Sequence, residues 1–534
     1  MQVQQSRDRI QLFFSATKLK DTDIIGGKSD PYLKVYIVEN KKKTLLGQTE
    51  TKENTKSPTW STPIELDYVF ELKQKLEFEV YDKDLLTADD LIAKGKCTLG
   101  QIMAEINKFE INLKTKDDKK DAGKLQIKSE KLTLSNTVEW AWSGVKLINV
   151  DFWTLTDPFL RFYSYNHKGE KVLVFENEVI KNNLDPVWKS HKQSITKLCQ
   201  GDFDKKILVE CWDHERTGGH RIVGSIESTM KEFIKTQGQK HELQNEERKK
   251  KGQKDLGFLL VQNIKITPPT FIDYVQGGYQ INVIAAVDFT ASNGDINDPI
   301  SLHSSDLLKN QYLQTLKKTL NVLLQFDSNK RIKLYGFGGV PQYPNLKSYD
   351  TDHCFPLTGD VKNHEVLGLD GVISAYQNAL QNVTLCGPTF FAPVIKNASD
   401  IARINSNNDV YNILLILTDG AIDDMEETIE LLGQATNLPL SIIVVGIGND
   451  TFEEMKALDG DLRMKSQNVQ RKHRDLVQFL AYNDVKGGEQ ELTRLLLAEV
   501  PNQFLQYQFN NDRYPKPPCG YVMEDILSSK KQQK

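Results

Sequence analysis

The chain has 534 residues, of which 39% are hydrophobic, and this length predicts about three to four folded domains. Its 68 basic and 72 acidic residues leave a net charge of -4, which excludes a general positive field, so we expect no nucleic-acid partner. No apolar run approaches the ~20 residues that a spanning helix needs. Gln2 excludes N-myristoylation, and six cysteines without paired spacing indicate reduced thiols. We therefore expect a cytoplasmic protein that touches membranes only through its folded surface.

The first half of the chain predicts two all-β sandwiches. From residue 6 to 134, turns separate short alternating runs such as Leu76-x-Phe78-x-Val80, and residues 140–266 repeat this texture. Two lysine-rich pieces, 114–120 and 246–254, are interpreted as solvated loops rather than binding surfaces.

After Pro268-Pro269 the pattern changes to alternating buried strands and helices. The expected strands are 281–287, 413–417 and 442–445, and the expected helices include 305–326 and 426–434. This alternation predicts an α/β domain with a doubly wound, mainly parallel sheet. The predicted domains are 1–134, 135–268 and 269–509, with a loosely ordered tail over 510–534.

One pattern of acidic residues occurs twice, with matching landmarks 127, 128 and 131 residues apart. The first copy reads Ser29-Asp30-Pro31-Tyr32, Pro58-x-Trp60 and Tyr81-Asp82-x-Asp84. The second copy reads Thr156-Asp157-Pro158-Phe159, Pro186-x-Trp188 and Trp212-Asp213-x-Glu215. Each acid lies where turn residues interrupt a strand, so the two sandwiches are expected to carry the same acidic loops.

In the first sandwich five aspartates are candidate calcium ligands: Asp23, Asp30, Asp82, Asp84 and Asp90. Either loop alone is well explained as an ordinary turn, but the recurrence of both loops favours a shared site. Calcium fits because it accepts six to eight oxygen ligands. Apolar residues beside the acids are expected to insert into a bilayer once calcium neutralises the rim: Ile24, Ile25, Leu85 and Leu86.

The second sandwich keeps Asp151, Asp157 and Asp213 but has Glu215 and Arg221 where the first copy has aspartates. Arg221 takes the place of Asp90 and supplies positive charge where a calcium ligand is wanted, so we expect calcium affinity to fall. Trp153, at the tip of the first loop, is a candidate membrane anchor, although a tryptophan is more often a core residue.

These loops resemble those of C2 domains, and residues 181–189 (KNNLDPVWK) and 271–281 (FIDYVQGGYQI) resemble the copine family. The resemblance covers residues 6–503 and implies two C2 domains followed by a von Willebrand A-like domain. The implied activity is calcium-dependent binding of acidic phospholipids, with movement from the cytoplasm to the plasma membrane or other membranes when calcium rises. The departures are Gly26-Gly27, which lengthens the first loop, and Glu215 and Arg221.

The third domain carries a separate set of oxygen ligands. Asp288, Thr290 and Ser292 follow one buried strand, Asp419 follows another, and Thr389 follows Gly387-Pro388. These residues are expected at the carboxyl ends of strands, where α/β sheets place ligands, and their oxygens suit magnesium or manganese. The set resembles the metal-ion-dependent adhesion site of von Willebrand A domains, which implies client proteins that donate a carboxylate to the metal.

Two functions are therefore weighed. The favoured one is a non-enzymatic adaptor that carries client proteins to membranes. The alternative is a magnesium-dependent phosphoryl-transfer enzyme with Asp288 or Asp419 as metal ligands, but the sequence offers no general base, lysine clamp or phosphate cradle for it.

Overall fold

The structure is a computed structural model. It describes residues 7–20, 29–39, 41–84, 88–105, 108–132, 135–151, 153–216, 218–253, 255–327, 329–420, 422–465, 474–518 and 523. By contacts, the chain divides into two compact units. Unit 1 contains 1–133 and 279–513, and unit 2 contains 134–278 and 514–534.

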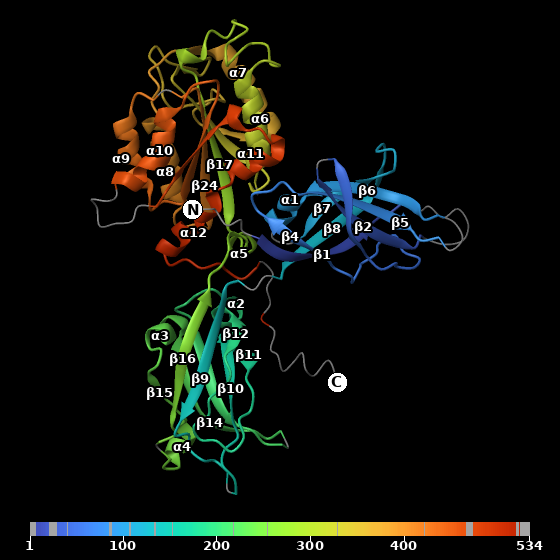
Figure 1. Cartoon of the computed structure of the whole chain (residues 1–534), viewed down its shortest axis with the longest axis vertical. Helices are drawn as coiled ribbons and strands as arrows, with labels where there is room; N and C mark the ends of the chain where they lie inside the picture. Colours follow the sequence, from blue (N-terminus) through green and yellow to red (C-terminus); the bar gives the residue numbers. More distant parts are fainter. Residues whose placement is uncertain are drawn as a thin grey trace. The chain divides into compact units, whose positions relative to one another are not determined.

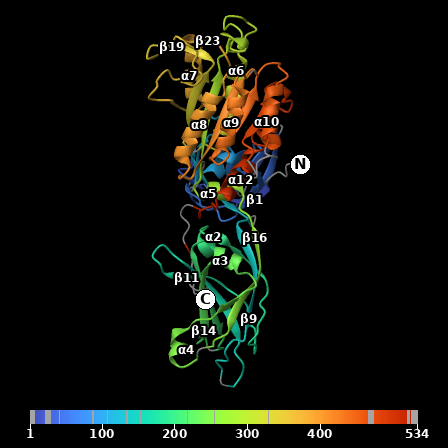
Figure 2. The same ribbon diagram turned by 90° about the vertical axis from the view of Figure 1, so that its left-hand side faces the viewer.

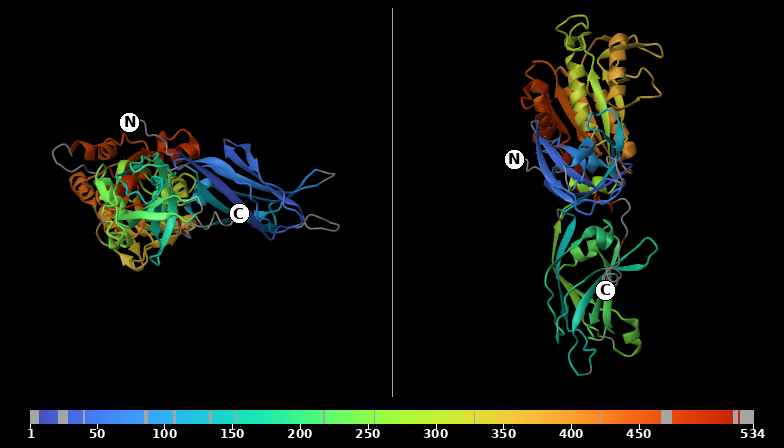
Figure 3. Two further views of the ribbon diagram at one scale, coloured as in Figure 1. Left: turned by 90° about the horizontal axis from the view of Figure 1, so that it is seen from below. Right: turned by 90° about the vertical axis from the view of Figure 1, so that its right-hand side faces the viewer.

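The first sandwich belongs to unit 1 and is built from antiparallel strands. Its elements are β1 (Arg7–Thr17), β2 (Pro31–Glu39), β3 (Lys42–Gln48), β4 (Ile64–Val69), β5 (Lys75–Asp82), β6 (Asp90–Thr98), α1 (Leu99–Ala104), β7 (Phe109–Lys114) and β8 (Asp121–Lys131). The strand order is β3-β2-β5-β6-β7-β8-β1-β4. The strands run along the long direction of this sandwich (Figure 3). Leu76, Phe78 and Val80 alternate into the core as predicted, because successive strand residues face opposite sides of a sheet.

The second sandwich belongs to unit 2. Its elements are β9 (Thr137–Val145), β10 (Pro158–Tyr165), β11 (Lys171–Glu176), β12 (His191–Ser194), α2 (Ile195–Cys199), β13 (Lys206–Asp213), β14 (Arg221–Thr229), α3 (Met230–Lys235), β15 (Lys240–Glu242), α4 (Glu246–Lys250), β16 (Phe258–Thr267) and α5 (Phe271–Gln276). Sheets β11-β10-β13-β14 and β12-β9-β16-β15 enclose a core that contains Trp140, Trp142 and Trp188. Helices α2 and α3 lie at one end of this sandwich and α4 at the other (Figures 1 and 2).

Three predictions about this region need correction. Residues 246–250 form helix α4 rather than a loop, because Asn245 caps the helix by accepting a hydrogen bond from the Arg248 backbone N–H (3.2 Å). Helix α5 groups by contacts with unit 2, which continues to residue 278, beyond the predicted end of the second domain at residue 268. The predicted loose tail is packed at its start, where the ring of Tyr514 stacks on Phe203 at 3.8 Å and joins the unit 2 core.

The α/β domain forms the rest of unit 1. Its strands are β17 (Gln280–Asp288), β18 (Arg331–Phe337), β19 (Gly339–Tyr343), β20 (Leu346–Lys347), β21 (Phe355–Pro356), β22 (Glu365–Leu367), β23 (Val383–Leu385), β24 (Val410–Thr418), β25 (Leu440–Gly446) and β26 (Val477–Ala481). Its helices are η1 (Ala291–Asn293), α6 (Gln311–Leu323), α7 (Gly368–Asn382), α8 (Ala392–Asn405), α9 (Met425–Ala435), α10 (Glu453–Lys465), η3 (Tyr482–Asp484), α11 (Gly488–Leu496) and α12 (Val500–Asn510).

The main sheet of this domain has the order β21-β18-β17-β24-β25-β26, and its neighbours from β18 to β26 are parallel. Helices α8, α9 and α10 cover one face, and α6, α7 and α11 cover the other (Figures 1 and 2). The predicted doubly wound sheet is thus confirmed. The carboxyl ends of the adjacent strands β17 and β24 lie side by side, which brings Asp288 near Thr418.

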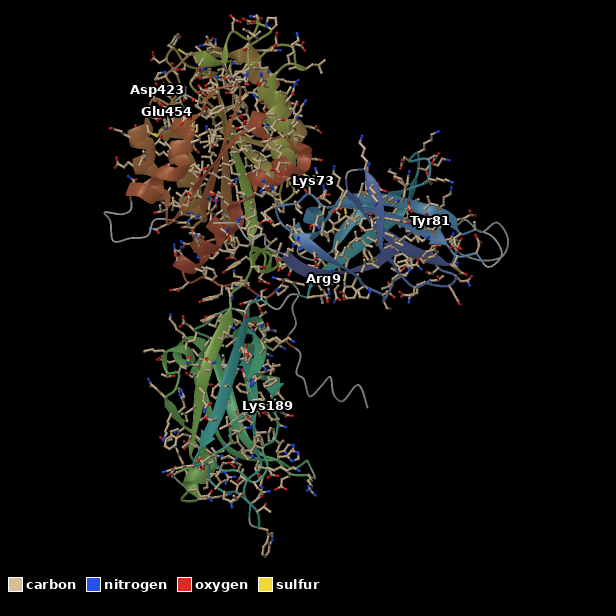
Figure 4. The ribbon with its side chains drawn as sticks, in the orientation of Figure 1. Arg9, Lys73, Tyr81, Lys189, Asp423 and Glu454 are labelled. Carbon is tan, nitrogen blue, oxygen red and sulfur yellow. The ribbon has the colours of Figure 1, made fainter. Side chains whose placement is uncertain are left out.

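Within unit 1 the first sandwich contacts the α/β domain. The ammonium groups of Lys73 and Lys75 donate to the carboxylate of Glu489 on α11, at 2.5 and 2.8 Å. The rings of Phe70 and Phe326 lie 4.4 Å apart. Figure 4 labels Lys73 on the side of the sandwich that faces α11. The contact therefore combines a charged cluster with an aromatic pair.

Candidate metal and membrane sites

The acidic loops of the first sandwich are organised by backbone hydrogen bonds. The buried carboxylate of Asp82 accepts from the Asp30 N–H (2.6 Å), and the Asp30 carboxylate accepts from the Asn54 N–H (2.6 Å). Asp90 lies opposite Asp82 in the β5–β6 pair, and Asp84 follows β5 by two residues. Four of the five predicted calcium ligands therefore lie at one end of the sandwich.

The remaining residues predicted for this site lie outside the described part of the chain: Asp23, Ile24, Ile25, Leu85 and Leu86. One acid was missed by the sequence interpretation. Asp89 accepts hydrogen bonds from the Tyr32 hydroxyl (2.6 Å) and the Lys83 ammonium (3.1 Å). The Tyr32 hydrogen bond is the main reason that the pKa of Asp89 lies below its ordinary value. Asp89 thus contributes a further fixed negative charge beside Asp90.

The second sandwich repeats this hydrogen-bond scaffold. The Asp213 carboxylate accepts from the Asp157 N–H (2.8 Å), and the Asp157 carboxylate accepts from the Asn182 N–H (2.7 Å). Asn54 and Asn182, also missed from the sequence, stand 128 residues apart, as Pro58 and Pro186 do. That shared spacing was the signal that could have identified them.

Arg221, which takes the place of Asp90 in the second sandwich, lies inside a cluster of acidic side chains. Its Nη2 donates to Asp151 Oδ1, to Asp213 Oδ2 (2.9 Å) and to Glu215 Oε1 (2.5 Å). Its Nη1 donates to the Val150 carbonyl (2.7 Å). Oxygens of the three carboxylates lie within 4.8 Å of one another, a spacing that suits a cation. The guanidinium therefore lies where the carboxylates converge.

Burial affects the pKa values of two side chains in this cluster, Asp213 and Arg221. The Asp213 side chain is completely buried, and burial raises its pKa, opposed mainly by the hydrogen bond from the Asp157 backbone. Burial would lower the pKa of Arg221, but the charges of Asp213, Glu215 and Asp151 outweigh it and raise that pKa. The charge of Arg221 thus offsets part of the cost of burying the Asp213 carboxylate, and the three carboxylates stabilise the charged form of Arg221.

The loop that carries Trp153 is held at its base. The Asn149 side-chain oxygen accepts from the N–H groups of Asp151 (3.2 Å) and Thr156 (3.1 Å), and the Thr154 hydroxyl donates to Asp151 (2.9 Å). Trp153 itself is 89% exposed, whereas Trp140, Trp142 and Trp188 are core residues. Trp153 is thus presented at the loop tip, where the sequence placed a membrane anchor.

In the α/β domain, Asp288 is fully buried at the end of β17 and is held by hydroxyl groups. Its Oδ1 accepts from the Thr290 N–H (2.8 Å) and hydroxyl (2.7 Å), and its Oδ2 accepts from the Thr418 hydroxyl (2.7 Å). The hydroxyl oxygens of Thr290 and Ser292 lie 2.9 Å apart. The structure therefore brings Asp288, Thr290 and Ser292 together and adds Thr418, which was missed.

A second carboxylate, that of the half-buried Asp419, lies beside Asp288. Among the described residues, its buried Oδ1 has no hydrogen-bond partner. Burial and the charge of Asp419 raise the pKa of Asp288 to about 7, and burial also raises the pKa of Asp419. The buried Asp288 and the half-buried Asp419, with its unpaired oxygen, form an oxygen-only set that fits magnesium or manganese, because a cation would compensate both charges.

Thr389 is anchored to the same edge of the sheet by Asp423. The Thr389 N–H donates to the Asp423 carboxylate (2.7 Å), and its carbonyl accepts from the Asp423 N–H (2.8 Å). Glu454 accepts from the neighbouring Ile422 N–H (3.2 Å), and Figure 4 labels both acids on the α8–α10 side. These contacts fix the loops that carry Thr389 and Asp419.

The buried ring of His303 contacts the backbone of Asp288 at the candidate metal site. Its Nε2 lies 2.7 Å from the Asp288 carbonyl and its Nδ1 lies 2.7 Å from the Tyr376 hydroxyl. Burial lowers the pKa of His303 to about 4, so the ring is neutral and acts as a positioning group. No motif in the sequence pointed to this histidine.

Among the described residues, no helix is long and apolar enough to cross a membrane. The family model described as Copine matches residues 301–516, and the C2 domain model matches twice, over 12–120 and 138–245. These matches fall on the α/β domain and on the two sandwiches. They confirm the resemblance drawn from the loop motifs.

Solved structures with partial similarity include three that span different parts of the chain. BON1-C2B is 25% identical over 24% of this chain and 90% of that chain, with a TM-score of 0.21. A calcium-bound structure of two C2 domains of Extended-Synaptotagmin 2 is 18% identical over 48% and 97%, with a TM-score of 0.23. Manganese-loaded Plasmodium vivax TRAP protein is 14% identical over 38% and 70%, with a TM-score of 0.26. At these TM-scores, the three structures add nothing to an assignment of function.

Proposed function

Because this chain belongs to the copine family, with two C2 domains before its copine domain, we propose that it is a calcium-dependent adaptor for acidic phospholipid membranes. In this proposal the first C2 domain is the calcium switch, and the copine domain recruits client proteins. The observation that carries the proposal is the difference between the two acidic loop sets: the first has Asp90 where the second has Arg221.

Backbone hydrogen bonds to two aspartates of the first C2 domain support calcium binding there. Backbone hydrogen bonds direct Asp30 and Asp82 toward one end of the sandwich, and Asp84 and Asp90 add further oxygens there. Asp23 is expected to complete the set. Calcium bound there would offset the repulsion between these carboxylates and between the loops and acidic headgroups. Ile24, Ile25, Leu85 and Leu86 are then expected to enter the bilayer.

The copine domain is suited to recruit protein partners through a divalent metal. Asp288, Thr290, Ser292, Thr389 and Asp419 are the residues that would hold magnesium or manganese. Such a metal would offer a coordination position to a carboxylate from a client protein. The buried, unpaired oxygen of Asp419 and the raised pKa of Asp288 support this assignment.

Co-sedimentation of the full chain with phosphatidylserine vesicles across a calcium titration tests the proposal. We expect calcium-dependent pelleting that is lost in Asp30→Asn/Asp82→Asn. A matched control is Asp202→Asn/Asp204→Asn, which removes the same charge from the exposed loop after α2. Pelleting that does not increase with calcium, or a calcium-induced increase that persists in the first variant, would contradict the proposal.

A further inference from the structure

The end of the second C2 domain that carries α4 gathers apolar and basic groups. The Ile148 N–H donates to the Leu256 carbonyl (3.2 Å), which ties the Trp153 loop to the segment after α4. The Arg248 guanidinium of α4 donates to the Ile222 carbonyl (2.9 Å), next to Arg221. Figure 2 shows α4 at the end opposite α2 and α3. The Trp153 loop, α4 and the Arg221 cluster therefore form one surface, which we call the loop end.

Two apolar side chains project from the loop end. Trp153 is 89% exposed and Leu155 is 43% exposed, and both belong to the loop whose base is fixed by Asn149. The exposed Trp153 ring leaves a large apolar surface in water, whereas the interfacial region of a bilayer accommodates a tryptophan ring and its polar N–H together. The loop end thus presents an insertion group that needs no rearrangement.

Several basic side chains belong to the elements of the loop end. Lys250 and Lys251 lie at the carboxyl end of α4, Arg216 lies beside Glu215, and Lys181 lies beside Asn182. All four are exposed, and within the described ranges none has a carboxylate within 4.0 Å. Basic groups near a membrane surface attract anionic headgroups, each by about 1 kcal/mol. These four side chains therefore supply positive charge that complements an acidic membrane.

Arg221 lowers the electrostatic obstacle that calcium lowers in other acidic loops, because its one positive charge offsets part of the charge of three carboxylates. Asp151, Asp213 and Glu215 would repel anionic headgroups, but all three accept hydrogen bonds from the same guanidinium. Because that cation is covalently part of the chain, its presence does not depend on the calcium concentration.

We propose that the loop end of the second C2 domain is a calcium-independent docking surface for acidic phospholipid membranes. Trp153 and Leu155 insert, Lys250, Lys251 and Arg216 bind headgroup phosphates, and Arg221 offsets part of the negative charge of the acidic loops. This inference rests on the proposed membrane function and assigns a second role within it: the second domain provides basal membrane affinity, and the first adds a calcium-dependent increment.

The test uses the full chain carrying Asp30→Asn/Asp82→Asn, in EGTA and at low ionic strength, in vesicle flotation. We expect flotation with phosphatidylcholine vesicles that contain phosphatidylserine, and none with phosphatidylcholine alone. Trp153→Ser should weaken the binding roughly tenfold. Lys250→Glu/Lys251→Glu should weaken it by at least roughly tenfold, since each reversal also adds repulsion.

Matched controls lie on α3, at the opposite end of the domain. Ile234→Ser removes a 39% exposed apolar residue, and Lys231→Glu/Lys235→Glu makes the same charge change as the α4 variant. These variants should bind vesicles as the parent does. Equal losses in control and test variants would overturn the inference, because binding would then depend on total charge rather than on the loop end.

A spectroscopic readout keeps the test independent of folding defects. In EGTA, vesicles containing brominated lipid should quench tryptophan emission of the parent chain, and Trp153→Phe should abolish that quenching. Absence of both flotation and quenching in EGTA overturns the inference. If the wild-type chain binds vesicles only after calcium is added, the calcium switch in the first C2 domain is supported and the docking surface is contradicted. If the chain binds in EGTA and calcium adds nothing, the docking surface is supported and the calcium switch is contradicted.

Discussion

Asp90 and Arg221 occupy the same register position in the two C2 domains. Asp90 pairs with Asp82 between β5 and β6, and Arg221 pairs with Asp213 between β13 and β14. In each pair of strands a register shift immediately precedes this position, at Val80/Tyr81 and at Cys211/Trp212. The same backbone therefore presents an additional carboxylate in one domain and an internal cation in the other.

Removal of this cation should destabilise the second C2 domain. We expect Arg221→Gln in EGTA to cost about 2 kcal/mol, less than for a fully buried ion pair because the Arg221 side chain is 41% exposed. Hydrogen exchange of peptides covering 206–229 measures the local effect. Calcium should restore protection in the variant but not change it in the parent. Unchanged exchange in EGTA would show that Arg221 does not stabilise the cluster.

Much of the fold was predictable because period-two and buried-strand patterns are strong in β5, β17, β24 and β25. The residues at which individual helices begin and end were less predictable. The helix predicted over 305–326 begins at Gln311 because Asn310 accepts a hydrogen bond from the Leu313 N–H (2.7 Å), a capping contact that the apolar pattern does not reveal. Tyr514 was assigned to a loose tail because one aromatic residue among prolines has no periodicity, although it finds an apolar partner in Phe203.

The acidic repeats located the candidate calcium sites, and the position of Arg221 relative to Asp90 followed from their alignment. The sequence could not show that Arg221 contacts three acids at once, because that depends on how far its side chain reaches across the loops. Thr418 and His303 were not identified as site residues because no motif links them to Asp288, from which they stand 130 and 15 residues away.

Arg221→Asp should create a calcium site in the second C2 domain, because it restores the acidic residue of the first. In the Asp30→Asn/Asp82→Asn background, isothermal calorimetry should detect new calcium binding. Arg216→Asp is the matched control, since it makes the same charge change in the same loop without touching the cluster. If both variants gained calcium binding equally, the total charge of the loop, and not the residue at position 221, would decide whether the second C2 domain binds calcium.

The copine domain should be stabilised by manganese or magnesium through Asp419. A metal at 100 times its dissociation constant adds about 2.7 kcal/mol to the stability of the form that binds it. We expect manganese to raise the thermal unfolding temperature of the wild-type chain and EDTA to reverse the change. Asp419→Asn should abolish the response, whereas Asp400→Asn, on the exposed face of α8, should retain it. A retained response in Asp419→Asn would exclude this aspartate as a ligand.

The phosphoryl-transfer alternative predicts a different result for the same domain. We expect no release of phosphate from ATP and magnesium that depends on Asp288. Incubation of the full chain and of Asp288→Ala with ATP and magnesium, followed by phosphate assay, makes the comparison. Release by the parent chain that is lost in the variant would revive the enzymatic function.

The most direct test of the division between the two C2 domains is a calcium titration of vesicle pelleting by Asp82→Asn and Asp213→Asn, side by side with the wild-type chain. The two substitutions remove equivalent buried carboxylates, each of which accepts a hydrogen bond from the loop before it. We predict that Asp82→Asn abolishes the calcium-induced increment and that Asp213→Asn weakens it only modestly. Equal losses in the two variants would contradict the account.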